Sequence, residues 1–533
     1  MKATSERADG GEHHDGTVPL SRPLKQKIRD GLVALSLANM CFLKVGFDLM
    51  YDTDRFFNKL PVTTPMLLAL LVNITGVALL AWLVMQMLRR FSSRLLHLAA
   101  HLVFLLLLLL PVDFIRLQLT TITDYQIFVF CTRPATLVCE LALLALIVWQ
   151  HRVAAKIGAV VIGILSPLAI VWFAKITFIC LGVISLEQCV TENVSPLSPG
   201  PVREGQPRVV WIIFDEMDYR LAFEQRPAVL HLPEFDLLRG QSLFATSAVP
   251  PADCTLQSMP SLILGRCISS VSLANTCDPS ITFADTGATS TLSGHPSVFS
   301  EARALGFNTA LVGWYIPYNR WLGDSLNFCE WYAYPYFEVA RAETFKLEIC
   351  LQIRSLAEAF NIRQLFVDMH RRSLRTSLSV VTNSTYGLVL LHLPAPHPPG
   401  VYKADKGKFT IWGMPRVGGY FNNVGLADHE LGELRRAMET SGEWNKTWII
   451  VSADHSWRGS ANYDGRRDYR VAYLVKPPGT NDYLAYSRQF NTILTHDLIL
   501  AILRGEVTNQ PSTACWLDAH GTQTAPVTGG RQD

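Results

Sequence analysis

The hydrophobic residues of this chain are concentrated in its first third, in runs that match or approach the length needed to cross a bilayer core of about 30 Å. The five runs cover residues 31–51, 65–88, 95–112, 128–149 and 157–184. The second and third runs contain no charged residue, whereas the other three each contain one or two. The pattern predicts a domain of five transmembrane helices within residues 31–186.

Positively charged residues flank these runs in alternate loops. The basic loops hold Arg22, Lys25, Lys27, Arg29, Arg89, Arg90, Arg94, Arg152 and Lys156, and the other loops hold Asp52, Asp54, Asp113 and Asp124. The positive-inside rule therefore predicts a cytoplasmic segment at residues 1–30 and places the chain beyond Leu186 on the outer side. Because the first 20 residues lack an apolar segment, we expect permanent anchors rather than a cleaved signal peptide.

The pattern changes after the last apolar run. Residues 194–207 contain four prolines, which predicts a stiff, extended linker over residues 187–207. Beyond it, short apolar runs typical of buried strands alternate with helical patterns. The strand-like runs are residues 208–214, 309–314, 388–393, 447–451 and 471–475, and the helical patterns include 297–305 and 425–438. Alternation of this kind predicts an α/β domain with a mostly parallel sheet at residues 208–520, followed by a flexible tail at 521–533.

Composition supports a membrane protein with a large globular part. Of the 533 residues, 49% are hydrophobic and 17% are charged, against about 25% charged in ordinary soluble chains. The mean hydropathy is +0.20. The net charge of +2 provides no basic field, so a nucleic-acid partner is not expected.

Acidic residues and a histidine follow two of the predicted strands. Asp215 and Glu216 come directly after the first strand, and Asp454 and His455 follow the strand at 447–451. Ligands of open α/β sheets bind at the carboxyl ends of strands, and mixed oxygen and nitrogen donors suit a divalent metal. Each motif alone is equally consistent with a helix cap or a turn.

A third element joins these two. Thr255 begins a helical pattern that has Gly265 ten residues later. The three motifs, in this order, resemble the alkaline phosphatase/sulfatase superfamily. The greatest resemblance is to its membrane-anchored phosphoethanolamine and phosphoglycerol transferases, such as lipoteichoic acid synthase and lipid A phosphoethanolamine transferase. The resemblance covers about residues 208–477.

The resemblance implies a set of functional residues. Thr255 corresponds to the catalytic nucleophile. The metal ligands correspond to Asp215, Thr255, Asp454 and His455, with Glu216 as a ligand or merely a neighbour. One divalent metal is implied, with Zn²⁺ expected and Mn²⁺ as the alternative.

Three further residues correspond to substrate-side positions of the family. His397 lies in the segment APHPPGVY, and Trp314 and Arg320 lie in GWYIPYNR. The resemblance implies that all three bind substrate and that His397 and Arg320 also take part in catalysis. Other histidines are expected to be structural: His392 within a strand, and His429 and His496 on helices.

Two departures from the family patterns bear on the chemistry. The transferases carry Glu where this chain has Asp215. Sulfatases carry Cys or Ser in a C/S-x-P-x-R run that is converted to formylglycine, whereas Cys254 is one residue early and neither Pro nor Arg follows in register. We therefore expect Thr255 to act unmodified on phosphate rather than sulfate.

The expected function is metal-dependent transfer of a phospholipid headgroup phosphoryl unit, phosphoethanolamine or phosphoglycerol, through a phospho-threonine intermediate. The expected partners are a phospholipid donor in the membrane and an envelope glycan or glycolipid acceptor. The resemblance implies the bacterial inner (cytoplasmic) membrane, with the catalytic domain on the periplasmic side. A membrane-anchored phosphodiesterase or sulfatase-like hydrolase is one alternative, and a non-catalytic envelope scaffold is another.

Overall fold

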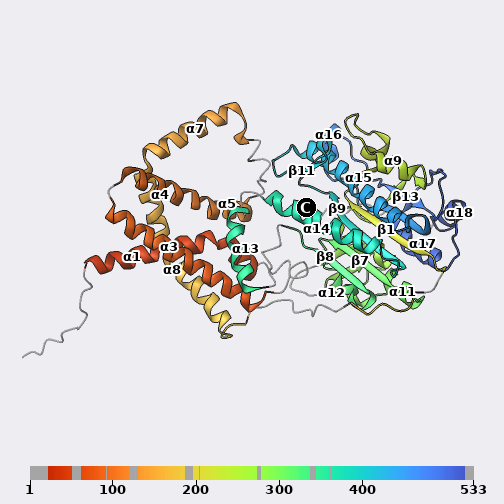
Figure 1. Cartoon of the computed structure of the whole chain (residues 1–533), viewed down its shortest axis with the longest axis horizontal. Coiled ribbons are helices and arrows are strands. Elements are labelled where there is room, and N and C mark those ends of the chain that lie inside the picture. The colour runs from red at the N-terminus through yellow and green to blue at the C-terminus, as the bar shows by residue number, and fades with distance from the viewer. Residues whose placement is uncertain are drawn as a thin grey trace, which may run out of the picture.

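The computed structural model describes most of the chain. The described residues are 22–50, 62–91, 93–120, 127, 130–185, 196–202, 205–272, 278–335, 344–358 and 362–521. The first 21 residues of the predicted cytoplasmic segment, much of the predicted linker and the tail beyond residue 521 lie outside them. Figure 1 shows a helical part from the first third of the chain beside an α/β part from the remainder.

The helical part contains the predicted apolar runs. Its helices are α1 (Arg22–Cys41), α2 (Leu43–Met50), α3 (Thr64–Arg90), α4 (Arg94–Leu107), α5 (Leu109–Leu119), α7 (Pro134–Trp149) and α8 (His151–Cys180). Three helical stretches are long and apolar enough to cross a membrane: Thr64–Arg90, Arg94–Arg116 and His151–Cys180. The pair α1 and α2, bent by 60°, brings the number to four if it forms one span.

The predicted count of five therefore differs from the three to four spans of sufficient length in the described residues. When the bent pair is counted as one span, the difference lies at the predicted helix 128–149, because α7 has only 16 residues, whereas a span needs about 20. In Figure 1, α7 stands away from the other helices.

The basic ends of the helices lie together. Arg89, in the last turn of α3, is 2.6 Å from Asp30 of α1, so these two helices run antiparallel with both basic ends on one side. His151, the first residue of α8, lies 2.8 Å from His101 of α4 between their Nδ1 atoms. The start of α8 is therefore beside the middle of α4.

The α/β part is built on an eight-stranded sheet in the order β14-β2-β13-β12-β1-β9-β7-β8. Its strands are β1 (Arg208–Asp215), β2 (Leu243–Ala245), β7 (Thr309–Trp314), β8 (Phe328–Tyr332), β9 (Leu388–Pro396), β12 (Thr447–Ala453), β13 (Tyr473–Lys476) and β14 (Leu484–Tyr486). All neighbours pair in parallel except β13, which is antiparallel to β12 and β2. The predicted mostly parallel sheet is confirmed, and β1 lies at its centre with every residue buried.

The α/β part also contains helices between its strands. They are η2 (Arg220–Glu224), α9 (Pro233–Arg239), α10 (Thr255–Leu264), α11 (Val298–Ala304), α12 (Asn319–Leu322), α13 (Phe345–Glu358), α14 (Ile362–Val381), α15 (Arg416–Thr440), α16 (Ala461–Asp464), α17 (Thr495–Leu503) and α18 (Gln510–His520). Helices α14 and α15 pack together on β9, and α11 and α17 pack together on β7 and β1. Short strands complete the part: β3 (Ala248–Val249), β4 (Ile268–Ser272), β5 (Ser280–Phe283), β6 (Thr289–Thr291), β10 (Tyr402–Lys403), β11 (Lys408–Phe409) and β15 (Phe490–Asn491).

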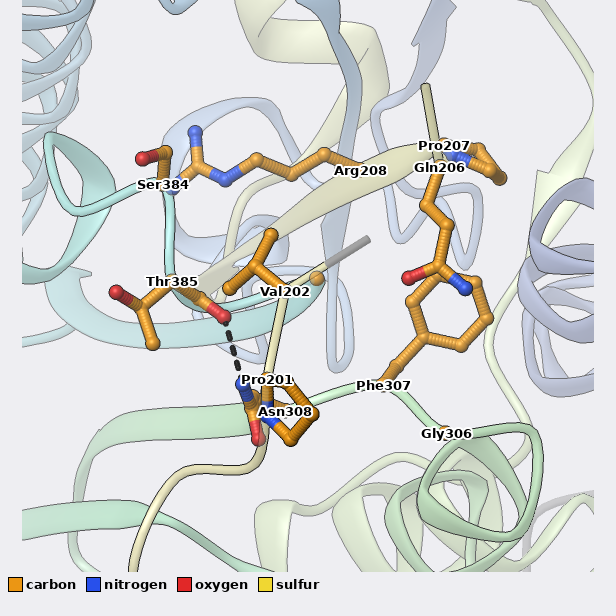
Figure 2. Close-up of a pocket in the computed structure, with 11 residues that line it drawn as sticks. Pro201, Val202, Gln206, Pro207, Arg208, Gly306, Phe307, Asn308, Ser384 and Thr385 are labelled. Carbon is orange, nitrogen blue, oxygen red and sulfur yellow. Dashed lines mark hydrogen bonds between the residues drawn. The ribbon is translucent and has the colours of Figure 1, made fainter. Parts of the chain in front are cut away.

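The described part of the proline-rich linker is fastened to the amino edge of the sheet. Asn308, before β7, donates to Gly200 O at 2.9 Å and accepts from its N–H at 2.7 Å. Asn327, before β8, donates to Leu197 O at 3.1 Å. Figure 2 shows a small cavity beside this contact, where Asn308 also donates to the Thr385 carbonyl. The chain from the membrane helices thus joins the sheet at its amino edge.

Candidate active site

The predicted site residues meet at the carboxyl edge of the sheet. Asp215 is the last residue of β1, and Asp454 and His455 directly follow the neighbouring strand β12. Thr255 is the first residue of α10. Strand ends from distant parts of the sequence and one helix start thereby bring four side chains into a buried cluster, in which none exposes more than 9% of its surface.

The Thr255 hydroxyl lies at the centre of this cluster. Its Oγ1 is 2.8 Å from Asp454 Oδ2, 3.4 Å from Asp215 Oδ2 and 3.3 Å from His455 Nε2. His455 Nδ1 lies 3.0 Å from Ser456 O, and because a carbonyl only accepts, Nδ1 carries the proton. The Nε2 lone pair of His455 therefore faces the carboxylates.

A glycine ends helix α10 and lets it pack closely against α17. Helix α10 ends at Gly265, which has φ +66° in the left-handed region that favours glycine. A Cβ there would lie 2.8 Å from the ring of His496 on α17. The ten-residue spacing from Thr255 to Gly265 is thus the length of one helix, and His496 packs against the end of that helix.

His392 is a site residue that sequence reasoning missed. It was expected to be structural, within a buried strand. It is buried, but its Nε2 lies 3.7 Å from Asp215 Oδ2, and candidate ligand atoms of Asp215, His392 and Asp454 all lie within 4.8 Å of one another. The missed signal is the register of β9, which pairs His392 with Ile213, two residues before Asp215.

A local feature of β7 positions His392. The Tyr318 hydroxyl lies 2.7 Å from His392 Nδ1. The Tyr318 ring reaches this position by lying over Gly313, where a Cβ would be only 2.4 Å from the ring. When Nδ1–H donates to the Tyr318 oxygen, the Nε2 lone pair of His392 points at Asp215.

The donor set fits a divalent metal ion. Within the described chain, the buried atoms Asp215 Oδ1 and His392 Nε2 have no hydrogen-bond partner. Buried polar atoms are nearly always paired, so two orphaned ligand atoms in one cluster point to a missing partner. Carboxylate oxygens with imidazole nitrogens are the donors of transition-metal sites such as those of Zn²⁺. The residues present therefore suit the metal that the resemblance implies.

The charges of the cluster are coupled. Burial alone would raise the pKa of Asp215, but the nearby imidazoles of His392, His397 and His455 outweigh it and bring the pKa down to about 2. Burial and the charge of Asp215 raise the pKa of Asp454. Burial would lower the pKa of His455, but the two aspartates raise it. Asp215 is therefore ionised at neutral pH, and the cluster concentrates negative charge that a cation would neutralise.

Glu216 forms an ion pair beside the cluster. Its φ of 65° is in the left-handed region, and its backbone N–H donates to Asp454 Oδ1 at 3.1 Å. Its carboxylate accepts from Arg458 Nε at 3.0 Å. The Glu216 side chain thus pairs with Arg458, and a role for Glu216 as a metal ligand stays a prediction.

Arg458 is the second residue that sequence reasoning missed. Its side chain is half-exposed, and the charges of Glu216, Asp215 and Asp454 raise its pKa against the effect of burial. It follows Asp454 by four residues. A cation in this position borders the cluster and is open to solvent, which is the arrangement that an anionic substrate requires.

The predicted substrate-side residues occupy different surroundings. The rings of Trp314 and His397 meet edge to face at 5.1 Å, and His397 is near enough to lower the pKa of Asp215. The guanidinium of Arg320, on α12, lies 6.0 Å from the ring of Trp331 in the edge strand β8. Trp314 and His397 thus border the cluster, and the role of Arg320 stays a prediction.

Comparison with known structures gives remote matches. The PsFucS1 sulfatase from Pseudoalteromonas sp. is 14% identical, with a TM-score of 0.38, over 56% of this chain and 68% of that chain. The phosphonate monoester hydrolase of Agrobacterium radiobacter is 12% identical, with a TM-score of 0.36, over 56% and 74%. A protein of the alkaline phosphatase superfamily from Vibrio parahaemolyticus is 13% identical, with a TM-score of 0.36, over 57% and 68%. Among curated proteins no match to the chain is found.

The match to a family model is more direct. The sulfatase model matches residues 207–503, which is more than half of the 533 residues. The matched region begins at β1 and ends with α17, so it contains the sheet and every residue of the buried cluster. The predicted resemblance to the alkaline phosphatase/sulfatase superfamily is confirmed, and the chain belongs to the sulfatase family.

Proposed function

We propose that this protein transfers a phosphoethanolamine or phosphoglycerol unit from a membrane phospholipid to an envelope glycan or glycolipid, with one divalent metal as cofactor. The observation that carries the proposal is the Thr255 hydroxyl, 2.8 Å from Asp454 Oδ2 inside a cluster of metal-type ligands. The α/β part belongs to the same chain as apolar helices long enough to cross a membrane, which supports a lipid substrate.

The proposed ligands are Asp215, His392, Asp454, His455 and Thr255. A bound divalent cation lowers the pKa of a coordinated hydroxyl and neutralises charge that grows on phosphoryl oxygens. Zn²⁺ suits the mixed nitrogen and oxygen set, with Mn²⁺ as the alternative. Side chains of the protein would carry out nucleophilic attack, substrate binding and proton transfer.

In the first half-reaction, Thr255 Oγ attacks the phosphorus atom and the bond between phosphorus and the diacylglycerol oxygen breaks. The threonine loses its proton and the departing diacylglycerol oxygen gains one, so charge and protons balance. His397 beside Trp314 is suited to hold or protonate the substrate. Arg458 is suited to bind a phosphoryl oxygen, and Arg320 is a second candidate for this role.

In the second half-reaction, a hydroxyl of the acceptor attacks the phosphorus atom of phospho-Thr255. The bond between phosphorus and Thr255 Oγ breaks, and the threonine recovers a proton as the acceptor loses one. An acceptor that excludes water gives transfer, whereas attack by water gives hydrolysis. The proposed location is the bacterial inner membrane, with the catalytic part on the periplasmic side.

The identity of the nucleophile favours phosphate over sulfate esters. The residue at the centre of the cluster is Thr255, whereas Cys254 is the residue that precedes α10. Formylglycine is an aldehyde made from Cys or Ser, and the extra methyl group of threonine prevents its formation. A direct attack by the threonine hydroxyl on phosphorus needs no such conversion.

The test uses purified full-length protein with labelled phosphatidylethanolamine and phosphatidylglycerol, with and without chelator. Thin-layer chromatography follows diacylglycerol release from wild type and from Thr255→Ala. The proposal predicts chelator-sensitive release from one of the two lipids and none from the variant. Cleavage of a soluble phosphodiester without release from either lipid would instead favour the hydrolase.

A further inference from the structure

One helix of the α/β part packs on the helical part. Helix α13 follows the edge strand β8 in the sequence and precedes α14, yet it packs along α3. Figure 1 shows α13 against the helical part. Gln352 Nε2 donates to Met66 O at 2.9 Å, and Asn73 Nδ2 donates to Gln352 Oε1 at 3.1 Å and to Ile349 O at 3.2 Å. This contact joins segments almost 300 residues apart in the chain.

The face of α13 toward α3 is a stripe with helical spacing. Glu348, Gln352 and Leu356 are separated by four residues each, and the first two are buried. Gln352 also donates to Glu348 Oε1 at 2.9 Å. Leu356 packs against the hydrophobic core of the helical part. The contact is therefore a built interface with polar groups paired inside it.

The outward surface of α13 is apolar at several positions. Leu347 and Ile353, on the side of the helix away from this stripe, are each 48% exposed. Lys346 and Arg354 are also exposed on this helix, and Arg354 Nη2 lies 3.9 Å from Asp368 Oδ2 of α14. Apolar side chains with intervening Lys and Arg, whose long stems reach toward headgroups, are typical of helices at a membrane interface.

The partner helix sets the depth of α13. Met66 and Asn73 belong to the first three turns of α3, a helix of 27 residues that can cross a membrane, and they are about 10 Å apart along its axis. The basic residues Arg89 and Arg90 lie at the opposite end of α3. Helix α13 is thus held at the level of one leaflet, on the side of the bilayer away from the basic loops.

The contact of α13 with α3 also orients the catalytic edge, which is the carboxyl edge of the sheet that carries the candidate active site. Strand β8 is parallel to β7, so its last residues lie at the carboxyl edge, which also carries Asp215 and Asp454. In Figure 1, α12, which follows β7, lies toward the helical part, whereas α11, which precedes β7, lies on the far side. The edge of the sheet that bears the site therefore faces the helical part.

We propose that α13 is a membrane-interface helix whose outward face contacts phospholipid, and that its contact with α3 holds the catalytic edge toward the headgroups. The occupant of the exposed face is the phospholipid leaflet around α3, because the face adjoins a helix that spans that leaflet. The inference deepens the proposed function. It rests on that function only where it says that the lipids under the active site include the phospholipid donor. Its physical content, lipid contact by α13, is measured without any turnover.

The test places a photo-reactive benzoylphenylalanine, by amber suppression, at Leu347 or Ile353 of the full-length chain. Val229, which is 83% exposed on the loop before α9, is the matched negative control, and Leu168, which is 68% exposed on α8, a helix long enough to cross a membrane, is the positive control. Each variant is reconstituted into vesicles of phosphatidylethanolamine and phosphatidylglycerol with tritiated acyl chains and then irradiated. We expect at least 5-fold more tritium on the protein from positions 347 and 353 than from 229. Equal labelling at 229 overturns the inference.

A second variant tests the tether, which is the contact of α13 with α3 through Gln352. Gln352→Ala removes the bonds to Met66, Asn73 and Glu348, so lipid labelling from position 347 is expected to fall at least 3-fold and the KM for vesicle lipid to rise about 10-fold. Cleavage of a soluble ester such as bis(p-nitrophenyl) phosphate is expected to stay within 2-fold of wild type. Unchanged labelling and KM contradict the tether.

The two proposals fail separately. Strong labelling from 347 and 353 by an enzyme that releases no headgroup overturns the proposed transfer and leaves the interface helix. Headgroup release by an enzyme with only background labelling does the reverse.

Discussion

Asp454 presents one carboxylate oxygen to Thr255 while the backbone holds the other. The N–H groups of Glu216 and His455 donate to Asp454 Oδ1 at 3.1 and 2.8 Å, and Oδ2 lies 2.8 Å from Thr255 Oγ1. Two fixed donors prevent the carboxylate from rotating. Because one of them, the N–H of Glu216, depends on a left-handed backbone, the turn after β1 is part of the machinery that aims Asp454.

The first prediction concerns the nucleophile. Thr255→Ala is expected to reduce headgroup release on the order of 10³-fold or more, because no other hydroxyl replaces the attacking group. Thr255→Ser keeps the hydroxyl and is expected to retain activity within about 10-fold. Initial rates of diacylglycerol release from the two variants make the comparison. Equal losses in both would show that the side chain acts through packing rather than as a nucleophile.

The second prediction concerns the support of His392. Tyr318→Phe removes the oxygen 2.7 Å from His392 Nδ1 and leaves the packing over Gly313. Loss of such an outer partner typically weakens metal binding about 10- to 100-fold. Competition with a chelator of known affinity measures this change. Tyr473→Phe, which removes a buried hydroxyl bonded to Thr495 instead, is the control and is expected to leave metal affinity unchanged.

The contrast between Asp215 and His392 shows what sequence can predict. Asp215 was predicted because it ends an apolar run, and strand ends meet at one edge of a parallel sheet. His392 was missed because a polar residue inside an apolar run is ordinarily a paired core residue, and only the register of β9 against β1 reveals that it lies beside Asp215. Register depends on packing between segments about 180 residues apart, which the local pattern does not contain.

The third prediction concerns the arginine at the site. Arg458→Gln is expected to reduce kcat/KM about 10- to 100-fold, because one charge-assisted hydrogen bond to the substrate, worth about 1.5–3 kcal/mol, is lost. The change is expected mainly as a higher KM. Arg488→Gln is the control, because Arg488 also pairs with a carboxylate but on the surface at Asp518. A change in Arg458→Gln no larger than in the control would exclude a role in binding. Arg320→Gln, measured in parallel, tests the residue that the resemblance implied.

The fourth prediction concerns pH. Asp428 on α15 accepts from the N–H groups of Glu234 and Phe235 at the start of α9, and burial raises its pKa to about 7. The folded state therefore binds this proton more tightly than the unfolded state, in which the pKa is about 4. The contribution of Asp428 to stability is full below about pH 4 and is lost as the pH rises toward 7.

Asp428→Asn keeps an oxygen acceptor and removes the titration. Relative to wild type, the variant is expected to gain stability as the pH rises from 5 to 7, by up to about 1.4 kcal/mol per pH unit. Thermal melting of the detergent-solubilised chain across this pH range measures the difference. A gap between the two proteins that is constant with pH would show that Asp428 is ionised throughout.

The membrane part illustrates a second limit of sequence. Apolar runs were located correctly, but whether a run forms a full span depends on where its helix begins, and α7 begins only at Pro134. The packing of α13 on α3 was not predicted at all. Its segment, FKLEICLQIRSLAE, has an amphipathic pattern that would equally suit a helix on the sheet, and only the contacts with Met66 and Asn73 place it at the membrane helices.

The most direct test of the central claim is to isolate the covalent intermediate. Full-length protein in vesicles of phosphatidylethanolamine or phosphatidylglycerol is quenched with acid in the absence of acceptor, and the peptide that contains Thr255 is analysed by mass spectrometry. The account predicts a phosphoethanolamine or phosphoglycerol adduct on Thr255 that disappears with chelator and in Thr255→Ala. Headgroup release at the wild-type rate by Thr255→Ala, with no adduct on this peptide, would contradict it.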